Sequence, residues 1–379
     1  MRLLLRPALA GIVLAAFTGA CGKEAIAPKS LSNPQATSAQ LASLDTIFNA
    51  TALRSFSAVS GSIQPTAPAP LPALALARAV SPLTESSELR PYANRILGAR
   101  IFARLLPELS TRAMDALFPV GVAGKTYEWD FGTLAYADKG RTGAPGTGVR
   151  FILYAIDPLT GYPANPAVEV GYIDLIDETG SGSPKLHVII AGVGGTPVYV
   201  NYTVTLASQT ASSVKITTAG YITNGASSPD SLKFNGTITA AGSQTSVSVT
   251  EDVSFDVNSR DLHVRNWQRV SLTQTSVSLR ISFRFEHGGE VVTLEGTLDV
   301  DETAGTVTGT ITAKVDGGLF ATCTVNGTST TYSLTCTGAD ADGLNADEQE
   351  ALHNLGNAVE SIGTVFEGIL GPAIGVLGA

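Results

Sequence analysis

The chain has 379 residues, of which 44% are hydrophobic and 15% are charged, and its formal net charge is −9 at pH 7. This much apolar material can bury a core, which excludes an intrinsically disordered protein. The acidic balance argues against nucleic acid as a partner, since phosphate recognition needs a basic surface. The length suits one large β domain or two ordinary ones.

The first residues have the pattern of an export signal. Arg2 and Arg6 precede an apolar run over Leu9–Phe17 that is too short to span a bilayer, and Thr18-Gly19-Ala20 then leads to Cys21 as a small-residue cleavage site. The pattern predicts a signal peptide over residues 1–20.

This segment resembles a bacterial lipoprotein signal, with Thr18 at the position where an aliphatic residue is usual. The resemblance implies lipidation of Cys21 and a membrane partner reached through that lipid. Ordinary signal peptidase could cut before the same cysteine without adding a lipid. Gly22 and Lys23 stand where an inner-membrane retention signal of the Asp type would lie, so the resemblance implies an outer-membrane lipoprotein facing the periplasm or the cell surface.

Residues 21–37 are small and polar, which predicts a flexible tether. Residues 38–118 form a helical and proline-rich segment. Its first helix is expected over Ser38–Ser60, where apolar residues recur at three- and four-residue steps and Ser38 or Ser43 can cap.

Two further stretches of this segment have distinct compositions. Gln64–Pro72 contains four prolines and predicts an extended spacer. Pro91–Leu106 is basic and amphipathic, so it either packs on its own domain with its arginine heads in water or lies on an anionic membrane.

Residues 119–338 are predicted to form an antiparallel β domain. From Lys125 onward the apolar period is 2, turn residues separate the runs, and no helix-length segment interrupts them. The fold class is therefore mainly β: a large curved antiparallel meander of about 13 strands, open or nearly closed into a barrel, packed with N-terminal and C-terminal helices and without parallel crossovers.

The register is best determined in the later strands. Gly288-Gly289 reads as a two-residue hairpin turn, which places Phe285 opposite Val292 and Ile281 opposite Gly296. Pairing across the next turn places Leu298 opposite Gly309. Glycines on the apolar face predict a strongly curved sheet and leave space there.

Residues 339–379 are expected to form an acidic helix. Asn345 and Glu348 are spaced as a capping box, and no Lys or Arg follows Lys314, so an anionic bilayer would repel this helix. We expect it to pack against the open side of the sheet.

The remaining two cysteines, Cys323 and Cys336, lie in neighbouring strand-like runs. In an oxidising compartment they predict a disulfide across a hairpin. A metal site is the weaker interpretation because no histidine lies nearby at ligand spacing.

The acidic stretch that follows the hairpin is the only weak calcium candidate. Asp340, Asp342 and Asp347 resemble a fragment of a calcium loop but lack the full spacing of one. Acidic residues before a helix also stabilise its N-terminus without a metal. The sequence thus predicts no cofactor and no metal.

The hairpin Leu262–Phe285 carries the most unusual surface, a candidate anion-binding patch. In the expected register Arg265 faces Arg284 and Arg269 faces Arg280, with Trp267 as a stacking surface beside them. The alternative is a ladder of ion pairs in which carboxylates of the flanking strands neutralise the four arginines; these carboxylates belong to Asp252, Asp256, Glu295 and Asp299.

No catalytic constellation emerges from the motifs and their spacing. The leading hypothesis is a non-catalytic, lipid-anchored envelope protein that binds a lipid or other hydrophobic molecule between sheet and helices. The alternative is a structural or protein- or glycan-interaction module with a filled core. A third class, an envelope hydrolase, would need two converging carboxylates.

Overall fold

The computed structural model describes residues 28–48, 116–180, 182–225, 231–243, 245–257, 260–328 and 331–356, and single positions at 52, 55, 56, 99, 358, 370, 373, 376 and 377. Cys21 with its signal, Gln64–Pro72 and nearly all of Pro91–Leu106 lie outside these residues. The expectations about them therefore stay predictions.

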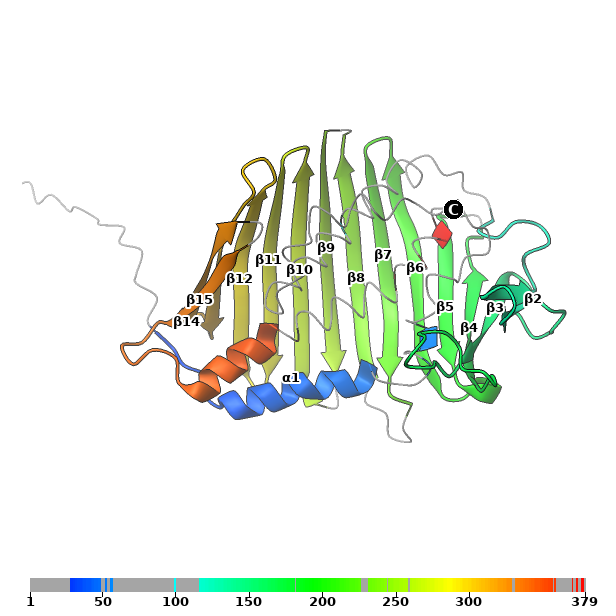
Figure 1. The fold of residues 1–379 in the computed structure, drawn as a ribbon, viewed down its shortest axis with the longest axis horizontal. Helices are drawn as coiled ribbons and strands as arrows, with labels where there is room; N and C mark the ends of the chain where they lie inside the picture. The colour runs from blue at the N-terminus through cyan, green and yellow to red at the C-terminus, as the bar shows by residue number, and fades with distance from the viewer. Residues whose placement is uncertain are drawn as a thin grey trace, which may run out of the picture.

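One sheet of fifteen strands forms the body of the protein (Figure 1). Adjacent strands in the sheet follow the sequence order from β15 to β3, after which come β1 and then β2 at the other edge. The strands are β1 (Thr126–Asp130), β2 (Ala135–Asp138), β3 (Gly148–Tyr154), β4 (Glu169–Asp177), β5 (Lys185–Ala191), β6 (Val198–Thr210), β7 (Ser213–Thr223), β8 (Ser231–Gly242), β9 (Ser246–Val257), β10 (Leu262–Thr273), β11 (Ser276–His287), β12 (Glu290–Asp301), β13 (Thr306–Val315), β14 (Gly318–Thr328) and β15 (Tyr332–Gly338). The predicted mainly β meander with helices is confirmed, and the sheet stays open.

The first two strands were not predicted, and they change the topology at one edge. β1 and β2 form an antiparallel hairpin, but β1 also pairs in parallel with β3, with Thr126 opposite Arg150. The expectation that the chain has no parallel crossover was therefore wrong. The crossover here is β2 and the loop after it, a connection without a helix that hydrophobic periodicity does not reveal.

The predicted register of the later strands is confirmed. Gly288 and Gly289 have φ values of +58° and +81°, as a two-residue turn of type I′ requires. Phe285 lies opposite Val292, and Leu298 lies opposite Gly309. Because side chains alternate between faces, this register places the large apolar residues of β7–β14 on one face.

Two helices of the continuously described stretches pack on that apolar face. α1 (Pro34–Phe48) begins four residues before the expected Ser38, because the side chain of Asn33 rather than a serine accepts a hydrogen bond from the Ala36 N–H at 3.0 Å. Leu41 of α1 joins the core cluster of the sheet.

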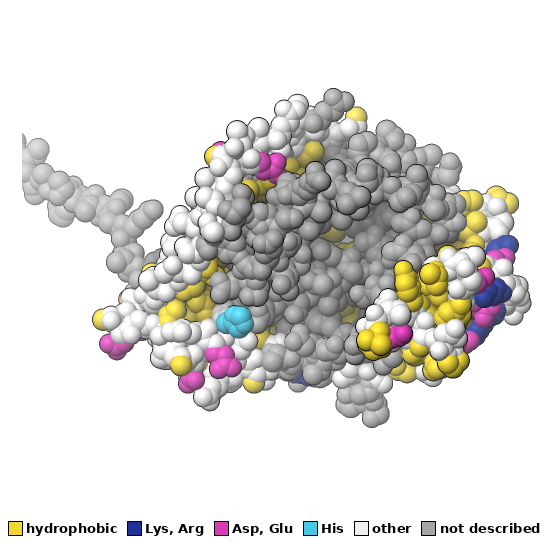
Figure 2. All heavy atoms as spheres, in the orientation of Figure 1, with side chains coloured by type: hydrophobic (Ala, Val, Ile, Leu, Met, Phe, Trp, Pro, Cys, Tyr) yellow, Lys and Arg dark blue, Asp and Glu magenta, His cyan; other side chains and the backbone are white. Residues whose placement is uncertain are grey.

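The second helix spans residues 346–356 of the described chain, and its expected capping box is present. The Asn345 N–H donates to Glu348 Oε2, and the Glu348 N–H donates to Asn345 Oδ1, both at 3.0 Å. In Figure 1 both helices lie at the lower ends of the strands. Figure 2 shows the same side of the molecule, with described apolar side chains at either end of the sheet.

The opposite, polar face is not uniform. At the β1–β4 end it carries a small second apolar cluster of Trp129, Ile152 and Tyr154. Arg150 beside this cluster makes two hydrogen bonds of 2.7 Å to Asp174, whose side chain is 7% exposed. Along β7–β14 the polar face is instead formed by hydroxyl and charged side chains that are exposed or half-buried.

Candidate ligand-binding surface

The hairpin of β10 and β11 brings the four predicted arginines together on the polar face. Arg265 lies opposite Arg284, and Arg269 lies opposite Arg280, as expected from the register. All four side chains are exposed, and Trp267 lies half-buried between the two arginines of β10.

Two of the four arginines are neutralised by carboxylates. Arg265 forms a bidentate ion pair with Asp252, with hydrogen bonds of 2.9 and 2.7 Å. These hydrogen bonds raise the pKa of the Arg265 guanidinium. Arg284 donates to Glu286 at 2.8 Å. The predicted ladder of ion pairs with the flanking strands is thus present for Arg265, whereas Arg284 pairs with Glu286 of its own strand, which was not predicted from the sequence.

Among the described residues, the other two arginines have no such partner. Of the expected carboxylates, Asp256 contacts His263 at 2.6 Å and Glu295 accepts a hydrogen bond from Lys314 at 2.7 Å. Asp299 lies diagonally from Arg280, opposite Ser278, and makes no ion pair with it. Within the described chain, Arg269 and Arg280 thus face each other across two strands without a neutralising carboxylate.

These two arginines belong to a line of residues that crosses the ten strands from β6 to β15 at right angles to the chain direction. Each member lies opposite the next in the register, and we call the line the transverse row. Its ten members are Ser208, Lys215, Thr239, Thr250, Arg269, Arg280, Thr297, Thr310, Thr324 and Thr335. The row contains three cations and seven hydroxyls but no carboxylate, whereas the parallel line through Trp267 contains Asp252 and Glu295.

Strand spacing sets the length of this surface. Neighbouring strands lie about 4.8 Å apart, so ten members in register extend over roughly 40 Å. Thr239 and Thr250 are half-buried and the other eight members are exposed. The sequence predicted the arginines but not the row, because a line across strands appears only when every register is known.

The apolar face offers little room beside its glycines. A Cβ on Gly296 would lie 2.6 Å from the Thr310 carbonyl oxygen and 2.9 Å from Cγ1 of Ile311, and one on Gly309 would lie 3.0 Å from Cδ1 of Leu298. The cavity next to them, between Leu279 and Ile311, has a volume of about 10 Å³, which is the lower limit for one water molecule. The large side chains of neighbouring strands occupy the space above these glycines.

Sequence reasoning missed a polar group on that apolar face. Asn266 and Gln268 of β10 are buried there, and the Gln268 side-chain amide donates to the Glu251 carboxylate at 2.5 Å. Each of the three also contacts further partners. Alternation alone would have shown this group, because Glu251, Asn266 and Gln268 occupy inward positions in the predicted strands.

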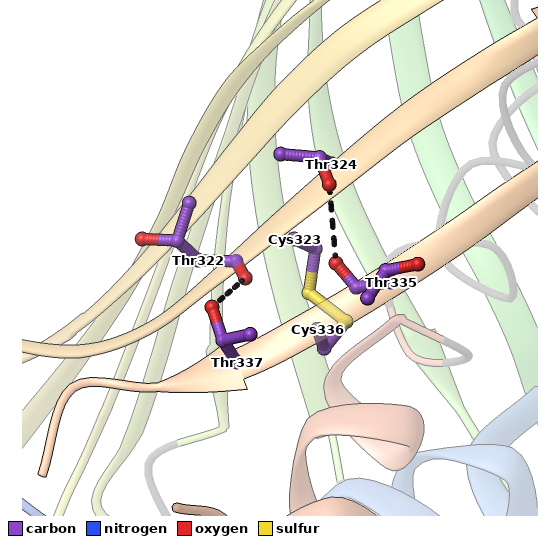
Figure 3. The surroundings of a disulfide bond; sticks show 6 residues. All are labelled: Thr322, Cys323, Thr324, Thr335, Cys336 and Thr337. Atoms are coloured by element: carbon purple, nitrogen blue, oxygen red, sulfur yellow. Dashed lines mark hydrogen bonds between the residues drawn. A yellow bond between two sulfur atoms is a disulfide. The ribbon is translucent and has the colours of Figure 1, made fainter. Parts of the chain in front are cut away.

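The predicted disulfide is present, and two of the acidic residues that follow it make hydrogen bonds to the N-terminal part of the described chain. Cys323 and Cys336 lie opposite each other and are bonded, which confirms the predicted pairing (Figure 3). Asp340 accepts a hydrogen bond from Ser30 at 2.9 Å, and Asp347 accepts one from Gln35 at 3.4 Å. The described residues contain no group of three or more side chains placed to hold a metal ion.

No helix among the described residues is both long and apolar enough to cross a membrane. The chain matches no family model, no curated protein and no solved structure.

Proposed function

We propose that this chain is a lipid-anchored, non-catalytic protein of the cell envelope that binds a polyanionic glycan along the transverse row. The observation that carries the proposal is the Arg269–Arg280 pair, two exposed guanidiniums opposite each other with no carboxylate between them. Like charges directly opposite each other destabilise a sheet. An anionic ligand that neutralises the two guanidiniums would remove this repulsion, and that gain adds to its binding free energy.

The chemistry of the row supports a glycan as the anion. Guanidinium groups bind carboxylates and sulfates through paired hydrogen bonds, and threonine hydroxyls can donate to and accept from sugar hydroxyls. Trp267 beside the arginines offers an aromatic surface for a sugar ring. Since the chain as a whole carries a net charge of −9, this local cationic track would also direct where an anionic polymer lands.

The start of the described chain supports an anchor at one end of the sheet. The Lys29 N–H donates to the Leu319 carbonyl of β14 at 2.9 Å, and the Ser32 N–H donates to Glu290 at 2.8 Å. Only six residues lie between Cys21 and Pro28, so a lipid on Cys21 would lie within about 25 Å of this attachment.

The test is a binding titration with a stated probe. The full chain, exported with Cys21→Ser, is titrated with polygalacturonate, with neutral dextran as the comparison polymer, at low and physiological salt. We expect binding to the acidic polymer only, weakening as salt rises. Arg269→Gln with Arg280→Gln should weaken binding roughly tenfold or more, since each lost charge-assisted hydrogen bond is worth about 1.5–3 kcal/mol.

A matched control sharpens the result. Arg265→Gln removes one arginine from the same hairpin, but that arginine is already paired with Asp252, so binding should change by less than about twofold. Equal losses in both variants, equal binding of dextran, or binding to phosphatidylglycerol vesicles instead of the polymer would contradict the proposal.

The hydrophobic-ligand hypothesis stays a prediction for the space between the sheet and the helical segment. Its test is native mass spectrometry of the same exported chain, checked against the denatured mass. An extra mass that extracts into organic solvent would favour that hypothesis over the glycan proposal.

A further inference from the structure

The two edges of the open sheet differ in how they are protected. At one edge, β2 has four residues, ends in Asp138, and is followed by Lys139 and Arg141. Short, charged strands at an edge discourage another chain from pairing there. At the other edge, β15 has seven residues over Tyr332–Gly338, with no charge and no proline.

The backbone groups at the β15 edge can be assigned from the register. Hydrogen bonds join Thr328 N to the Thr331 carbonyl and Ala339 N to the Phe320 carbonyl, at either end of an unshifted β14–β15 ladder. Hydrogen-bonded pairs recur every second residue, so Ser333, Thr335 and Thr337 direct their N–H and C=O groups to β14. The backbone groups of Leu334 and Cys336 therefore point outward, and no hydrogen bond satisfies them within the described chain.

The outer edge is also held in place. The Cys323–Cys336 bond fixes β15 to β14, and Thr324 and Thr337 add side-chain hydrogen bonds across the same pair of strands (Figure 3). Ser333, Thr335, Cys336 and Thr337 are exposed. A strand that is extended, uncharged and fixed is a ready template for strand addition.

We propose that β15 is a docking edge for β15 of a second copy of this chain, joined by a twofold axis through Thr335. Thr335 is the midpoint of Tyr332–Gly338, so only this antiparallel register pairs the full length of both strands. The same register pairs Leu334 with Cys336 of the second copy, and these are residues whose backbone groups point outward.

Side-chain chemistry fits this register on both faces. Leu334 and Cys336 belong to the apolar side, and they meet each other across the axis. On the polar side Thr335 meets Thr335, and Ser333 meets Thr337, so hydroxyl pairs with hydroxyl and no charge is opposed. The transverse rows of the two copies would then run end to end through Thr335.

A seven-residue ladder is a small interface, so the dimer should be weak in solution and cross-linking is the main measurement. In a Cys21→Ser full chain, Thr335→Cys places two thiols opposite each other in a non-hydrogen-bonded pair, with Cα atoms about 4.5 Å apart. The single variants Ser333→Cys and Thr337→Cys each place their own thiols about 14 Å apart, too far to bond.

Under mild oxidation T335C should form a covalent dimer at least tenfold faster than S333C or T337C, with the 335–335 link identified by peptide mapping. Equal slow rates for the three variants would overturn the proposal. A second measurement is sedimentation equilibrium at about 0.1 mM: Thr335→Lys should abolish dimer by opposing two ammonium groups, whereas Thr310→Lys, two strands inward on the same row, should retain it. Loss in both variants, or a monomer in the parent, would also overturn it.

Discussion

The two ends of the sheet are held together by different means. Strands β6–β14 have ten to thirteen residues each, and β9–β13 pair along nearly their whole lengths with tight turns between them. Strands β1–β5 have four to nine residues and include the parallel pair. Both groups contain register shifts, at Leu153 and Ile190 in the shorter strands and at Leu206 and Ala313 in the longer ones. Backbone hydrogen-bond ladders and alternating apolar side chains are enough to hold strands β6–β14 together.

The β1–β5 end relies on specific polar contacts. Arg141 is within 3.3 Å of Glu128 and also pairs with Glu169, which lowers the pKa of the Glu169 carboxyl. Arg150 binds Asp174 and lies 3.6 Å from the ring centre of Tyr172. Where strands are short, individual side chains must supply the order that a long ladder supplies elsewhere.

The largest expected effect tests this contrast directly. Arg150→Met leaves the buried Asp174 carboxylate without its partner, and we expect a loss of about 3–5 kcal/mol in the free energy of unfolding. Arg265→Met removes an exposed bidentate pair between β9 and β10 and should lower the free energy of unfolding by about 0–1 kcal/mol. Urea unfolding of both variants gives the comparison, and similar losses would show that burial is not what separates the two ends.

The disulfide tests what holds the edge strand β15 to the sheet. β15 pairs on one side only, and Cys323 and Cys336 close a loop with a sequence separation of 13. Cys323→Ser with Cys336→Ser should cost about 3 kcal/mol on the chain-entropy model. Differential scanning calorimetry measures the loss, and reduction of the parent chain should reproduce it. An unchanged melting temperature would mean that the ladder alone secures β15.

A smaller effect on stability is expected from substituting a glycine of β12, with a glycine of the second helix as the comparison. Gly296→Ala places a methyl group against the Thr310 carbonyl, a backbone atom that cannot move aside, and should cost about 1–3 kcal/mol. Gly356→Ala in the second helix meets nothing within 4 Å and should stabilise by up to about 1 kcal/mol. If G296A is neutral in denaturant unfolding, the strands are less closely packed there than the distances imply.

The smallest expected effect concerns pH. A hydrogen bond from the His263 ring to the Asp256 carboxylate, with charge contributions from Asp256, Asp261 and Glu286, raises the pKa of His263 above its ordinary value near 6.5. The folded state therefore binds the proton more tightly, so this stabilisation is complete below about pH 6.5 and is lost as pH rises through the raised pKa.

An NMR titration of His263 measures this shift. Asp256→Asn should bring the pKa back toward 6.5 and reduce the pH dependence of unfolding by a few tenths of a kcal/mol, as expected for an exposed pair. An unshifted His263 in the parent would show that the Asp256 contact is not populated in solution.

The alternation of apolar residues and the turn residues between the runs were enough to predict the strands β3–β15 from the sequence. The strands β3–β15, the pairing of Phe285 with Val292, the Cys323–Cys336 bond and the Asn345–Glu348 cap all follow from patterns confined to one element or one hairpin. Local patterns predict such features because a two-residue turn permits only one register and a cap needs only one spacing.

Tertiary structure decided the features that depend on distant residues. The parallel pairing of β1 with β3 and the burial of Asp174 leave no periodic signal in so short a stretch. The predicted arginine patch shows the division most clearly. The register placed four arginines together, but the positions of carboxylates on other strands determined that Arg265 is neutralised and that Arg269, within the described chain, is not, because an ion pair forms only where two side chains can reach each other.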